Sequence, residues 1–453
     1  MNRKWYYAAI AVILVGLLFH QPLLLLLGLL ALFILLAADI WAKYCLRDVR
    51  YKRELGEKRA LFGEEITLSL TIENAKLLPL PWLEIEEIVP RNLVFIGRNL
   101  RISVSNNSVL LESLFSLRWY ERVTRRYSVR CVARGVHAFG PTTMRSGDVF
   151  GFQSRQETLA NRQYVLVYPM IVPLTRFSLP ARHPFGDYTA HRRIIEDPAR
   201  VVGVRDYMYG DDLRRIHWKA TARALQIQSK LYQPTTTYTL VMFLNVATQL
   251  DIYYGIHPEI QELTICVAAS VANWALDEGL AVGLFANTTM YMPELGMSLP
   301  AEQAGSEEKS SNVESIVAEQ LKRRRIHLPP SSNEEQRRRI METLARIQSY
   351  FGSPIEDLLQ AERGRLPAGA TVVVITSAIS DPLLDALSRV RQSGHAVTIL
   401  FVGDNTIAPK LAGVTIYHLG GEETWKRLMA GYTAPTGEGE TLEAFVGAAS
   451  ITL

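Results

Sequence analysis

Cysteine is scarce in this chain of 453 residues, whose three cysteines, Cys45, Cys131 and Cys266, lie far apart. Their spacing gives no disulfide framework and no CxxC metal pair, so a reducing compartment fits best. The sequence has no GxxxxGK[ST], and no GxGxxG follows the first strand of its α/β portion, which argues against the common nucleotide sites. A large excess of one charge is also missing: the formal net charge is +4, which argues against a dedicated nucleic-acid-binding protein.

Long apolar runs gather at the N-terminus. Residues 5–19 and residues 22–38 carry no charge. Only His20 and Gln21 separate the two runs, and the second run begins with Pro22. Each run is short for a solitary span, but interfacial residues extend it towards the ~20 residues that a bilayer requires. Because the backbone must satisfy its own hydrogen bonds in hydrocarbon, we predict a transmembrane helical hairpin over residues 1–42, in contact with the lipid bilayer through residues 5–38.

Basic residues flank both ends of this hairpin. They are Arg3 and Lys4 before it, and Lys43, Arg47, Arg50, Lys52 and Arg53 after it. The positive-inside rule therefore predicts a multi-pass protein of the cell membrane whose soluble domains lie on the cytoplasmic side. A cleaved signal peptide is the alternative, but the second apolar run and the positive charge behind it weigh against cleavage.

Apolar and polar side chains alternate through residues 48–170. The alternation is clear at residues 65–74, 83–89, 109–119 and 125–133, and turn sequences separate these segments. This pattern predicts half-buried strands in an all-β, immunoglobulin-like sandwich. The acidic residues of these strands are expected on solvent-facing surfaces, and nothing in this region points to catalysis.

Continuous apolar runs replace the alternation in residues 236–453. Runs typical of strands buried on both faces lie at residues 239–246, 280–286, 371–376 and 396–402. Helical patterns lie at residues 259–279, 333–351 and 381–394, and a further strand and helix follow at 413–419 and 422–431. The alternation of strands and helices predicts an α/β domain with an open, mostly parallel sheet.

The most densely charged stretch, RDYMYGDDLRRIHWKATAR at residues 205–223, lies in a predicted linker over residues 171–235. Gly210 permits a turn, and Asp211 or Asp212 is a good N-cap for a helix that begins near Leu213. Arg205 and Tyr207 precede the turn, so we expect them to reach back to the aspartates.

Three interpretations of this stretch are open. As a structural clamp, its charges pin the linker against the α/β domain with Trp218 wedged between them. As an active site, His217 and the aspartates supply acid–base groups, but their spacings do not face one another on a helix and no Ser or Cys nucleophile stands among them. As a nucleic-acid surface, it joins basic tracts at residues 322–325 and 337–339, but acids are interleaved throughout. The clamp is the favoured interpretation, so no catalytic residue is assigned.

This stretch, together with the N-terminal hairpin and the segments ARGVHAFGP and SGDVFGF, resembles the bacterial family called domain of unknown function 58. The signature residues that carry the resemblance are Arg205, Tyr207, Gly210, Asp211, Arg214, Ile216, Trp218, Lys219 and Arg223. The resemblance implies a C-terminal domain like von Willebrand factor A. It also implies two partners, a MoxR-type AAA+ ATPase and a transglutaminase-like membrane protein.

Metal-binding von Willebrand A domains place Asp-x-Ser-x-Ser after their first strand, because a hard divalent ion needs several oxygen ligands. The corresponding positions here are Asn245, Ala247 and Gln249, and Ser377 lies in the later loop where an Asp would often follow the strand. The anchoring carboxylate is therefore missing. We expect a vestigial site, or one that binds without metal, and no cofactor.

These features predict a multidomain, membrane-anchored and non-enzymatic protein-interaction module. The resemblance makes it a partner or adaptor of a MoxR-type AAA+ ATPase in the assembly or maturation of envelope complexes. One alternative is an enzyme, a hydrolase or part of a cell-wall pathway, that uses residues 205–223. The other is a binder of anionic lipid or nucleic acid, although the charge balance disfavours a nucleic-acid partner.

Overall fold

A computed structural model describes residues 4–97, 100–102, 108–148, 153–177, 195–209, 211–235, 238–249, 255–293, 325–348, 354–367, 369–404 and 413–433. Arg3, Gly210 and residues 322–324, which the sequence analysis singled out, lie outside these ranges. The chain divides into two compact units. The first consists of Met1–Pro169 with Met292–Met297, and the second of Met170–Tyr291 with Ser298–Leu453.

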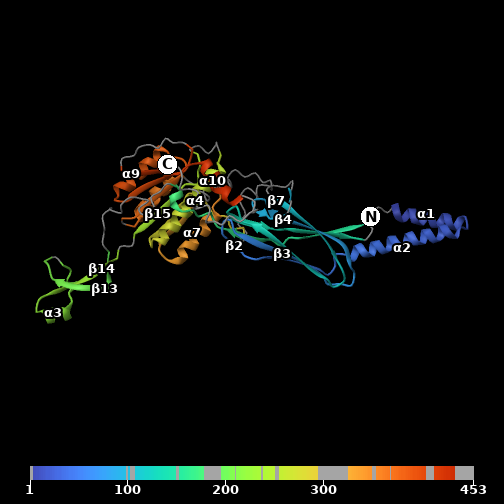
Figure 1. Cartoon of the computed structure of the whole chain (residues 1–453), viewed down its shortest axis with the longest axis horizontal. Helices are drawn as coiled ribbons and strands as arrows, with labels where there is room; N and C mark the ends of the chain where they lie inside the picture. Colours follow the sequence, from blue (N-terminus) through green and yellow to red (C-terminus); the bar gives the residue numbers. More distant parts are fainter. Residues whose placement is uncertain are drawn as a thin grey trace, which may run out of the picture. The chain divides into compact units, whose positions relative to one another are not determined.

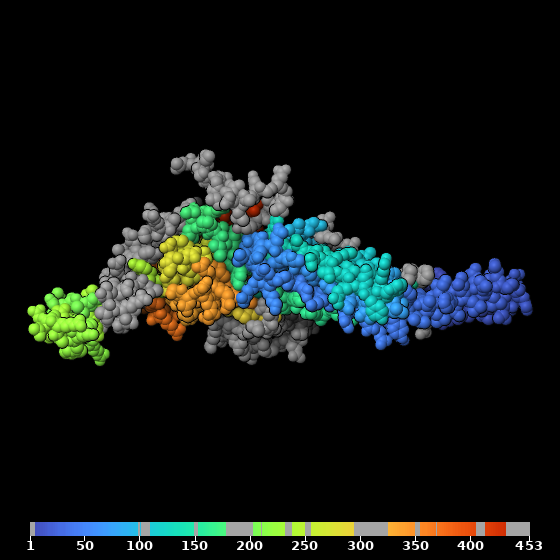
Figure 2. Space-filling view, turned by 60° about the horizontal axis from the view of Figure 1, so that its bottom comes forward, coloured from blue at the N-terminus to red at the C-terminus, as the bar shows by residue number. Residues whose placement is uncertain are grey.

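Two apolar helices begin the first unit, α1 (Lys4–Leu18) and α2 (Pro22–Tyr44), and they lie side by side (Figure 1). Two glycines without side chains permit this close approach. A Cβ atom at Gly28 would lie only 2.6 Å from Ile13 Cγ1, and one at Gly16 only 2.8 Å from the Leu25 nitrogen. Figure 2 shows the surface of the pair in blue. Among the described residues, α2 alone is long and apolar enough to cross a membrane. The predicted membrane anchor is confirmed to that extent.

The C-terminal end of α2 is embedded in the β-structure of the same unit. Ala38, Ala42 and Cys45 are buried, and Cys45 belongs to an apolar cluster with Leu80 and other strand residues. Lys76 Nζ donates hydrogen bonds to the carbonyl oxygens of Cys45 and Arg47, both at 2.7 Å. The first of these bonds satisfies the carbonyl group of the residue that caps α2. Burial of the ammonium group lowers the pKa of Lys76.

The first unit contains three sheets, with strand orders β1-β3-β8-β5, β11-β10-β4-β7-β6 and β2-β12-β9. The strands are β1 (Val49–Leu55), β2 (Arg59–Ala60), β3 (Glu65–Asn74), β4 (Leu80–Pro90), β5 (Val94–Phe95), β6 (Arg101–Ile102), β7 (Ser108–Leu117), β8 (Arg122–Arg130), β9 (Gly135–Phe139), β10 (Thr142–Gly147), β11 (Ser154–Leu159) and β12 (Gln163–Val167). Their pairings are antiparallel, apart from the parallel pair of β2 and β12.

Inward-facing side chains from all three sheets form a shared core. Leu68 and Leu70 of β3, Leu111 of β7, Phe139 of β9 and Val165 of β12 are among its members. Burial alternates along β3 and β4, as the period of the sequence predicts. The all-β character of this region is confirmed, while its immunoglobulin-like topology stays a prediction.

One acid of this core contradicts the expectation that the acids face solvent. Glu87 is completely buried, because it has the same parity on β4 as the core residues Ile85 and Val89. Its carboxylate pairs with the buried guanidinium of Arg53 and accepts hydrogen bonds from the hydroxyl groups of Tyr51, at 2.7 Å, and Thr142. Burial and the neighbouring carboxylate raise the pKa of Tyr51. The strands therefore enclose a buried ion pair that the alternation alone does not reveal.

The second unit contains a six-stranded sheet of order β17-β16-β15-β18-β19-β20. Its strands are β15 (Thr239–Leu244), β16 (Ala281–Ala286), β17 (Ile326–Ser331), β18 (Thr371–Thr376), β19 (Ala396–Phe401) and β20 (Thr415–His418). Neighbours are parallel, except that β17 runs antiparallel to β16. Pro329 and Pro330 are compatible with β17 because it is an edge strand. The mostly parallel α/β sheet is confirmed.

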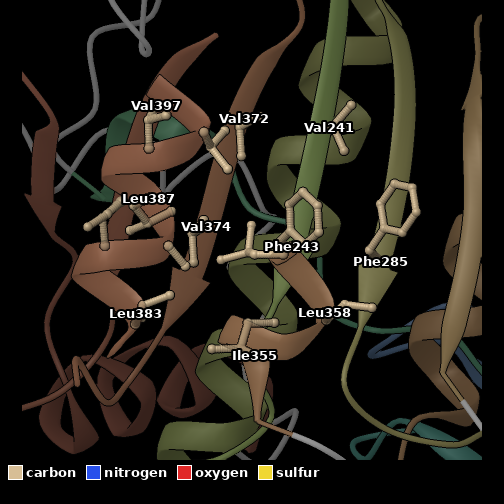
Figure 3. Close-up of a cluster of buried hydrophobic side chains, with 14 of the residues drawn as sticks. Val241, Phe243, Phe285, Ile355, Leu358, Val372, Val374, Leu383, Leu387 and Val397 are labelled. Atoms are coloured by element: carbon tan, nitrogen blue, oxygen red, sulfur yellow. The ribbon is translucent and has the colours of Figure 1, made fainter. Parts of the chain in front are cut away.

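Three helices contact the strands of this sheet: α4 (Pro258–Asp277), α8 (Ile355–Glu362) and α9 (Asp381–Gln392). Two further helices, α7 (Glu334–Arg346) and α10 (Glu422–Thr433), contact α4, and short 3-10 turns are η1 (Leu174–Phe177) and η5 (Arg363–Arg365). Helix α4 contacts β15, β16 and β18. Leu358 of α8 and Leu387 of α9 pack with Val241, Phe243 and Val374 of the strands (Figure 3). The strands β15, β16 and β18 are buried along nearly their whole length, which explains their continuous apolar sequences.

Candidate functional site

The signature stretch forms the end of a small β-hairpin in the second unit (Figure 1). Strands β13 (Ile195–Asp206) and β14 (Gln228–Thr235) pair antiparallel, with Asp206 opposite Gln228. The connection between them contains the 3-10 turn η2 (Leu213–Arg215) and the short helix α3 (Trp218–Ala224). We call residues 205–229 the hairpin tip. The described part of the region expected to be a linker thus contains a β-hairpin.

Asp211 holds the first part of the tip together. Its Oδ1 accepts a hydrogen bond from Arg205 Nη2 at 2.7 Å, and its Oδ2 accepts one from the Met208 backbone N–H at 3.1 Å. The Tyr207 hydroxyl donates to the Asp211 carbonyl oxygen at 3.3 Å. The Met208 N–H and the Arg205 guanidinium lower the pKa of Asp211. Arg205 and Tyr207 therefore reach back to this aspartate, as the sequence predicts.

The single helix expected from Leu213 onward is wrong, because Ile216 interrupts it. Asp212 Oδ1 caps η2 by accepting a hydrogen bond from the Arg214 N–H at 3.0 Å. Ile216 then has an extended backbone, forms a bridge with Ser229 and buries its side chain. Pairing with β14 thus takes the place of a continued helix.

His217 caps the second helical piece. Its Nδ1 accepts a hydrogen bond from the Ala220 N–H at 3.0 Å, at the start of α3. Because Nδ1 is the acceptor, the proton of the neutral imidazole lies on Nε2. This is the ordinary chemistry of an N-cap, so His217 has a structural use that the sequence analysis did not assign.

The expected wedge of Trp218 is also wrong, because this side chain is 71% exposed. It is the first residue of α3, and that short helix has no buried residue. Met208, Leu213 and Leu225 are exposed as well, and Tyr209 is fully exposed. The hydrogen-bonded backbone of the tip therefore presents large apolar side chains to solvent.

The remaining signature residues of the tip are polar and exposed. Arg214 lies on η2, while Lys219 and Arg223 lie four residues apart on α3. Together with Trp218, these side chains supply positive charge and an aromatic surface, which suits binding.

Gln228, which the sequence analysis did not single out, ties both parts of the tip to β14. Its Nε2 donates to Asp206 Oδ1 at 2.6 Å, and its backbone N–H donates to Thr221 Oγ1 at 3.0 Å. Its carbonyl oxygen accepts a hydrogen bond from the His217 N–H at 2.8 Å. Residues 227–232, IQSKLY, show no alternation of apolar and polar side chains, so the sequence carries no strand signal that would have pointed to this residue.

A second polar group of residues lies at the carboxyl ends of β15, β16 and β18. Asn245 Nδ2 donates to Thr376 Oγ1 at 3.0 Å, and Asn287 Nδ2 donates to Asn245 Oδ1 at 2.9 Å. Asn245 Oδ1 also accepts from the Ala247 N–H at 3.2 Å. Both asparagines are buried. The amide of Asn245 is therefore engaged at both of its polar atoms.

The donor set at this place does not fit a divalent metal ion. Ala247 and Gln249 are half-buried and follow Asn245, while Ser377 Oγ lies 3.2 Å from Thr264 Oγ1. Divalent ions of the magnesium type prefer carboxylate oxygens, whereas these groups are amides and hydroxyls that bind one another. In the part of the chain that the structure describes, no three His, Cys, Asp or Glu side chains gather to hold a metal.

The basic tract at residues 337–339 lies on α7 and is balanced by acids. Arg337 donates to Asp277 Oδ1 at 2.5 Å, and Arg338 and Arg339 each approach Glu335 Oε1 at 3.3 Å. The side chains of Arg338 and Arg339 are more than half exposed. This tract is therefore a solvated helix face with its own counter-charges.

Comparison with solved structures gives weak likenesses for about a quarter of the chain. The CARDB domain of the PF1109 protein from Pyrococcus furiosus is 11% identical, with a TM-score of 0.18, over 27% of this chain and 90% of that one. A cohesin module of a Clostridium perfringens family 33 glycoside hydrolase is 12% identical, with a TM-score of 0.19, over 26% of this chain and 95% of that one. At TM-scores this low, neither likeness identifies a fold.

Comparison of sequences is more informative. The family model described as "Protein of unknown function DUF58" matches residues 203–428, a range that includes the hairpin tip and the six-stranded sheet. The uncharacterized protein YeaD of Bacillus subtilis (strain 168) is 24% identical over 251 residues, which span 55% of this chain and 58% of that protein. Through these residues, the chain belongs to the DUF58 family of proteins of unknown function.

Proposed function

We propose that this chain is a membrane-anchored, non-enzymatic protein-interaction module whose hairpin tip binds a MoxR-type AAA+ ATPase. In this proposal α1 and α2 cross the bilayer as a hairpin, and both soluble parts lie on the cytoplasmic side. The protein acts as a partner or adaptor of the ATPase in the assembly or maturation of envelope complexes, alongside a transglutaminase-like membrane protein.

The close packing of the two N-terminal helices supports the hairpin. Gly16 and Gly28 allow contact along both helices, and the Tyr6 hydroxyl donates to the Leu35 carbonyl oxygen at 3.2 Å. Helix α1, of 15 residues, is shorter than a typical span of ~20 residues, but a partner helix and its aromatic end residues extend its reach. The basic residues on either side favour the cytoplasm for both ends.

The strand order of the second unit supports a von Willebrand A-like domain. Numbered from β15 along the chain, the strands lie in the order 3-2-1-4-5-6, with the third antiparallel. The order of the strands changes direction between β15 and β18, and such a switch point creates a binding crevice at the carboxyl ends of the strands. The mostly antiparallel strands of the first unit, whose inward side chains form a shared core, likewise favour an immunoglobulin-like sandwich, which acts here as a spacer.

The observation that carries the proposal is the apolar surface of the hairpin tip. Tyr209, Trp218 and Leu225 are exposed by more than two thirds, although burial of such side chains is favourable. Trp, Tyr and Arg are the residue types that dominate the energetics of protein–protein interfaces. The hydrogen bonds of Asp211 and Gln228 hold the backbone that presents these apolar side chains. Binding therefore carries only a small entropic cost for ordering the tip.

The family resemblance selects the partner, and a binding measurement tests it. The full-length chain is reconstituted in nanodiscs and titrated with the MoxR-type ATPase of the same organism. Trp218→Ala should weaken binding about 30-fold or more, because loss of a central aromatic anchor costs at least about 2 kcal/mol. The matched control is Trp119→Ala, which removes an exposed tryptophan from the first unit and should leave the Kd unchanged.

The same titration separates the proposal from its rivals. Equal affinity of the Trp218→Ala variant and the parent would contradict docking through the tip. A His217→Asn variant keeps an N-cap but removes the imidazole. If that variant binds normally yet fails to complement a deletion strain, the acid–base interpretation of residues 205–223 replaces the present one.

A further inference from the structure

A cavity of about 480 Å³ lies where α2 meets β11, within the first unit. Three basic side chains line it, Lys43, Arg47 and Arg155, together with Tyr44 and one carboxylate, Glu157. Its volume is in the range of small-ligand sites. Basic groups outnumber the acid, so the cavity favours an anion.

The cations of this cavity are arranged around the end of α2. Arg155 Nη1 donates to the Lys43 carbonyl oxygen at 2.8 Å, which fixes β11 against the helix. Lys43 Nζ and the Arg47 guanidinium lie 5.8 and 5.9 Å from the centre of the Tyr44 ring. The Asp48 contact of Arg47 is long, at 3.8 Å, and both side chains are largely exposed, so it neutralises Arg47 only weakly.

The position of the cavity along α2 indicates what it meets. The uncharged part of the helix runs from Pro22 to Ala38, which corresponds to about 26 Å at the rise of an α-helix. A hydrocarbon core is about 30 Å thick, so this part alone almost fills it. Asp39, bound by Gln153 Nε2 at 2.9 Å, and Lys43 therefore lie at the depth of the lipid headgroups.

We propose that this cavity binds the phosphate of an anionic phospholipid between Lys43, Arg47 and Arg155, with the Tyr44 ring against the glycerol and upper acyl chain. The inference rests on the proposed membrane anchor, because it requires α2 to cross the bilayer. Guanidinium groups bind phosphate oxygens through paired N–H donors, and an aromatic ring is favoured at this depth of a membrane. The lipid thereby fastens the first unit to the membrane surface.

The test is native mass spectrometry of the full-length chain in detergent, titrated with phosphatidylglycerol or phosphatidylcholine. The parent should bind phosphatidylglycerol first and more tightly. Each cation near an anionic surface contributes a factor of about 5 to the binding affinity. The double variant Arg47→Gln/Arg155→Gln should therefore bind phosphatidylglycerol about 25-fold more weakly than the parent and bind phosphatidylcholine with unchanged affinity. Arg155→Lys keeps the charge and should keep most of the preference.

The matched control is Lys58→Gln/Arg91→Gln. Both residues are exposed and belong to the first unit. Lys58 follows the end of β1 and Arg91 the end of β4, and both of these strand ends lie away from α2. The affinity of this variant for phosphatidylglycerol should therefore stay within 2-fold of that of the parent. Equal affinity of the parent for the two lipids would overturn the site. Displacement of phosphatidylglycerol by equimolar glycerol phosphate would overturn the lipid assignment in favour of a soluble phosphate. Extraction of the chain from membranes by alkaline carbonate would instead overturn the anchor, and with it the proposed function.

Discussion

Removing the charge of Glu87 should destabilise the first unit strongly. The Glu87 side chain is fully buried and that of its partner Arg53 is 3% exposed, so Glu87→Gln leaves a buried guanidinium without a counter-ion. Breaking a buried ion pair in this way costs about 3–5 kcal/mol. The second guanidinium nitrogen keeps its hydrogen bond to the Asn161 carbonyl oxygen, at 2.7 Å, but a neutral carbonyl does not replace the carboxylate.

A double-mutant cycle gives the magnitude of the coupling. The unpaired charge that Glu87→Leu or Arg53→Met leaves behind should cost about 3–5 kcal/mol in each single variant. Glu87→Leu and the double variant both also leave the hydroxyl groups of Tyr51 and Thr142 without the carboxylate, at about 1–3 kcal/mol each. The hydroxyl cost therefore cancels in the cycle, and the double variant should cost less than the sum of the single variants by about the cost of the two unpaired charges, about 6–10 kcal/mol.

Hydrogen exchange of the β3 and β4 amides in the full-length protein measures the stability of this unit by itself. Glu73→Gln is the matched control, because Glu73 pairs with Arg122 at 2.7 Å on the partly exposed face of β3. Such an exposed pair contributes about 0–1 kcal/mol. The reasoning is refuted if Glu87→Gln costs no more than Glu73→Gln, or if the two single effects simply add in the double variant.

The pKa of Asp211 is lowered from 3.8, so its contacts stabilise the tip above pH ~4 and this contribution is lost as the pH falls through the lowered pKa. Amide exchange of residues 205–228, corrected for intrinsic rates, should therefore accelerate in that window in the parent and not in Asp211→Asn. Mg²⁺ should change the Tm of the full chain little. If the free energy of unfolding rises by about 1.4 kcal/mol at a Mg²⁺ concentration ten times Kd, and Asn245→Ala abolishes this rise, the closed amide network is contradicted. A reporter fused after Leu453 should be active only as a cytoplasmic enzyme, and periplasmic activity would overturn the predicted topology.

The sequence predicts this fold best where burial is simple. The strand at residues 65–74 and the one at 371–376 have the predicted bounds, because one is buried on alternate residues and the other on all. Helices α4 and α9 begin within one residue of their predicted starts, where a proline lies in the first turn. Strand β17 escaped prediction because Pro329 and Pro330 argue against a strand unless its edge position is known.

The candidate site was harder to predict, because its structure depends on contacts between distant residues. The Arg205–Asp211 contact is local, and the sequence indicates it. The break at Ile216 depends on pairing with Ser229, and the exposure of Trp218 depends on how short α3 becomes as a result. Glu87 shows the same limit, since its burial is readable from strand parity only when the buried partner Arg53 is known.

The embedded end of α2 has a consequence for how the protein responds to membranes of different thickness. A spanning helix longer than the local hydrocarbon layer tilts, and a shorter one thins the bilayer. One face of the last turns of α2 packs on the strands, Arg155 binds the Lys43 carbonyl oxygen, and Lys76 binds the carbonyl oxygens of Cys45 and Arg47 just after the helix, so tilting α2 by itself would break these contacts. If α2 crosses a thinner bilayer and tilts, the strands of the first unit therefore have to tilt together with it. Under the proposed topology, bilayer thickness would therefore set the tilt of the strands of the first unit relative to the membrane.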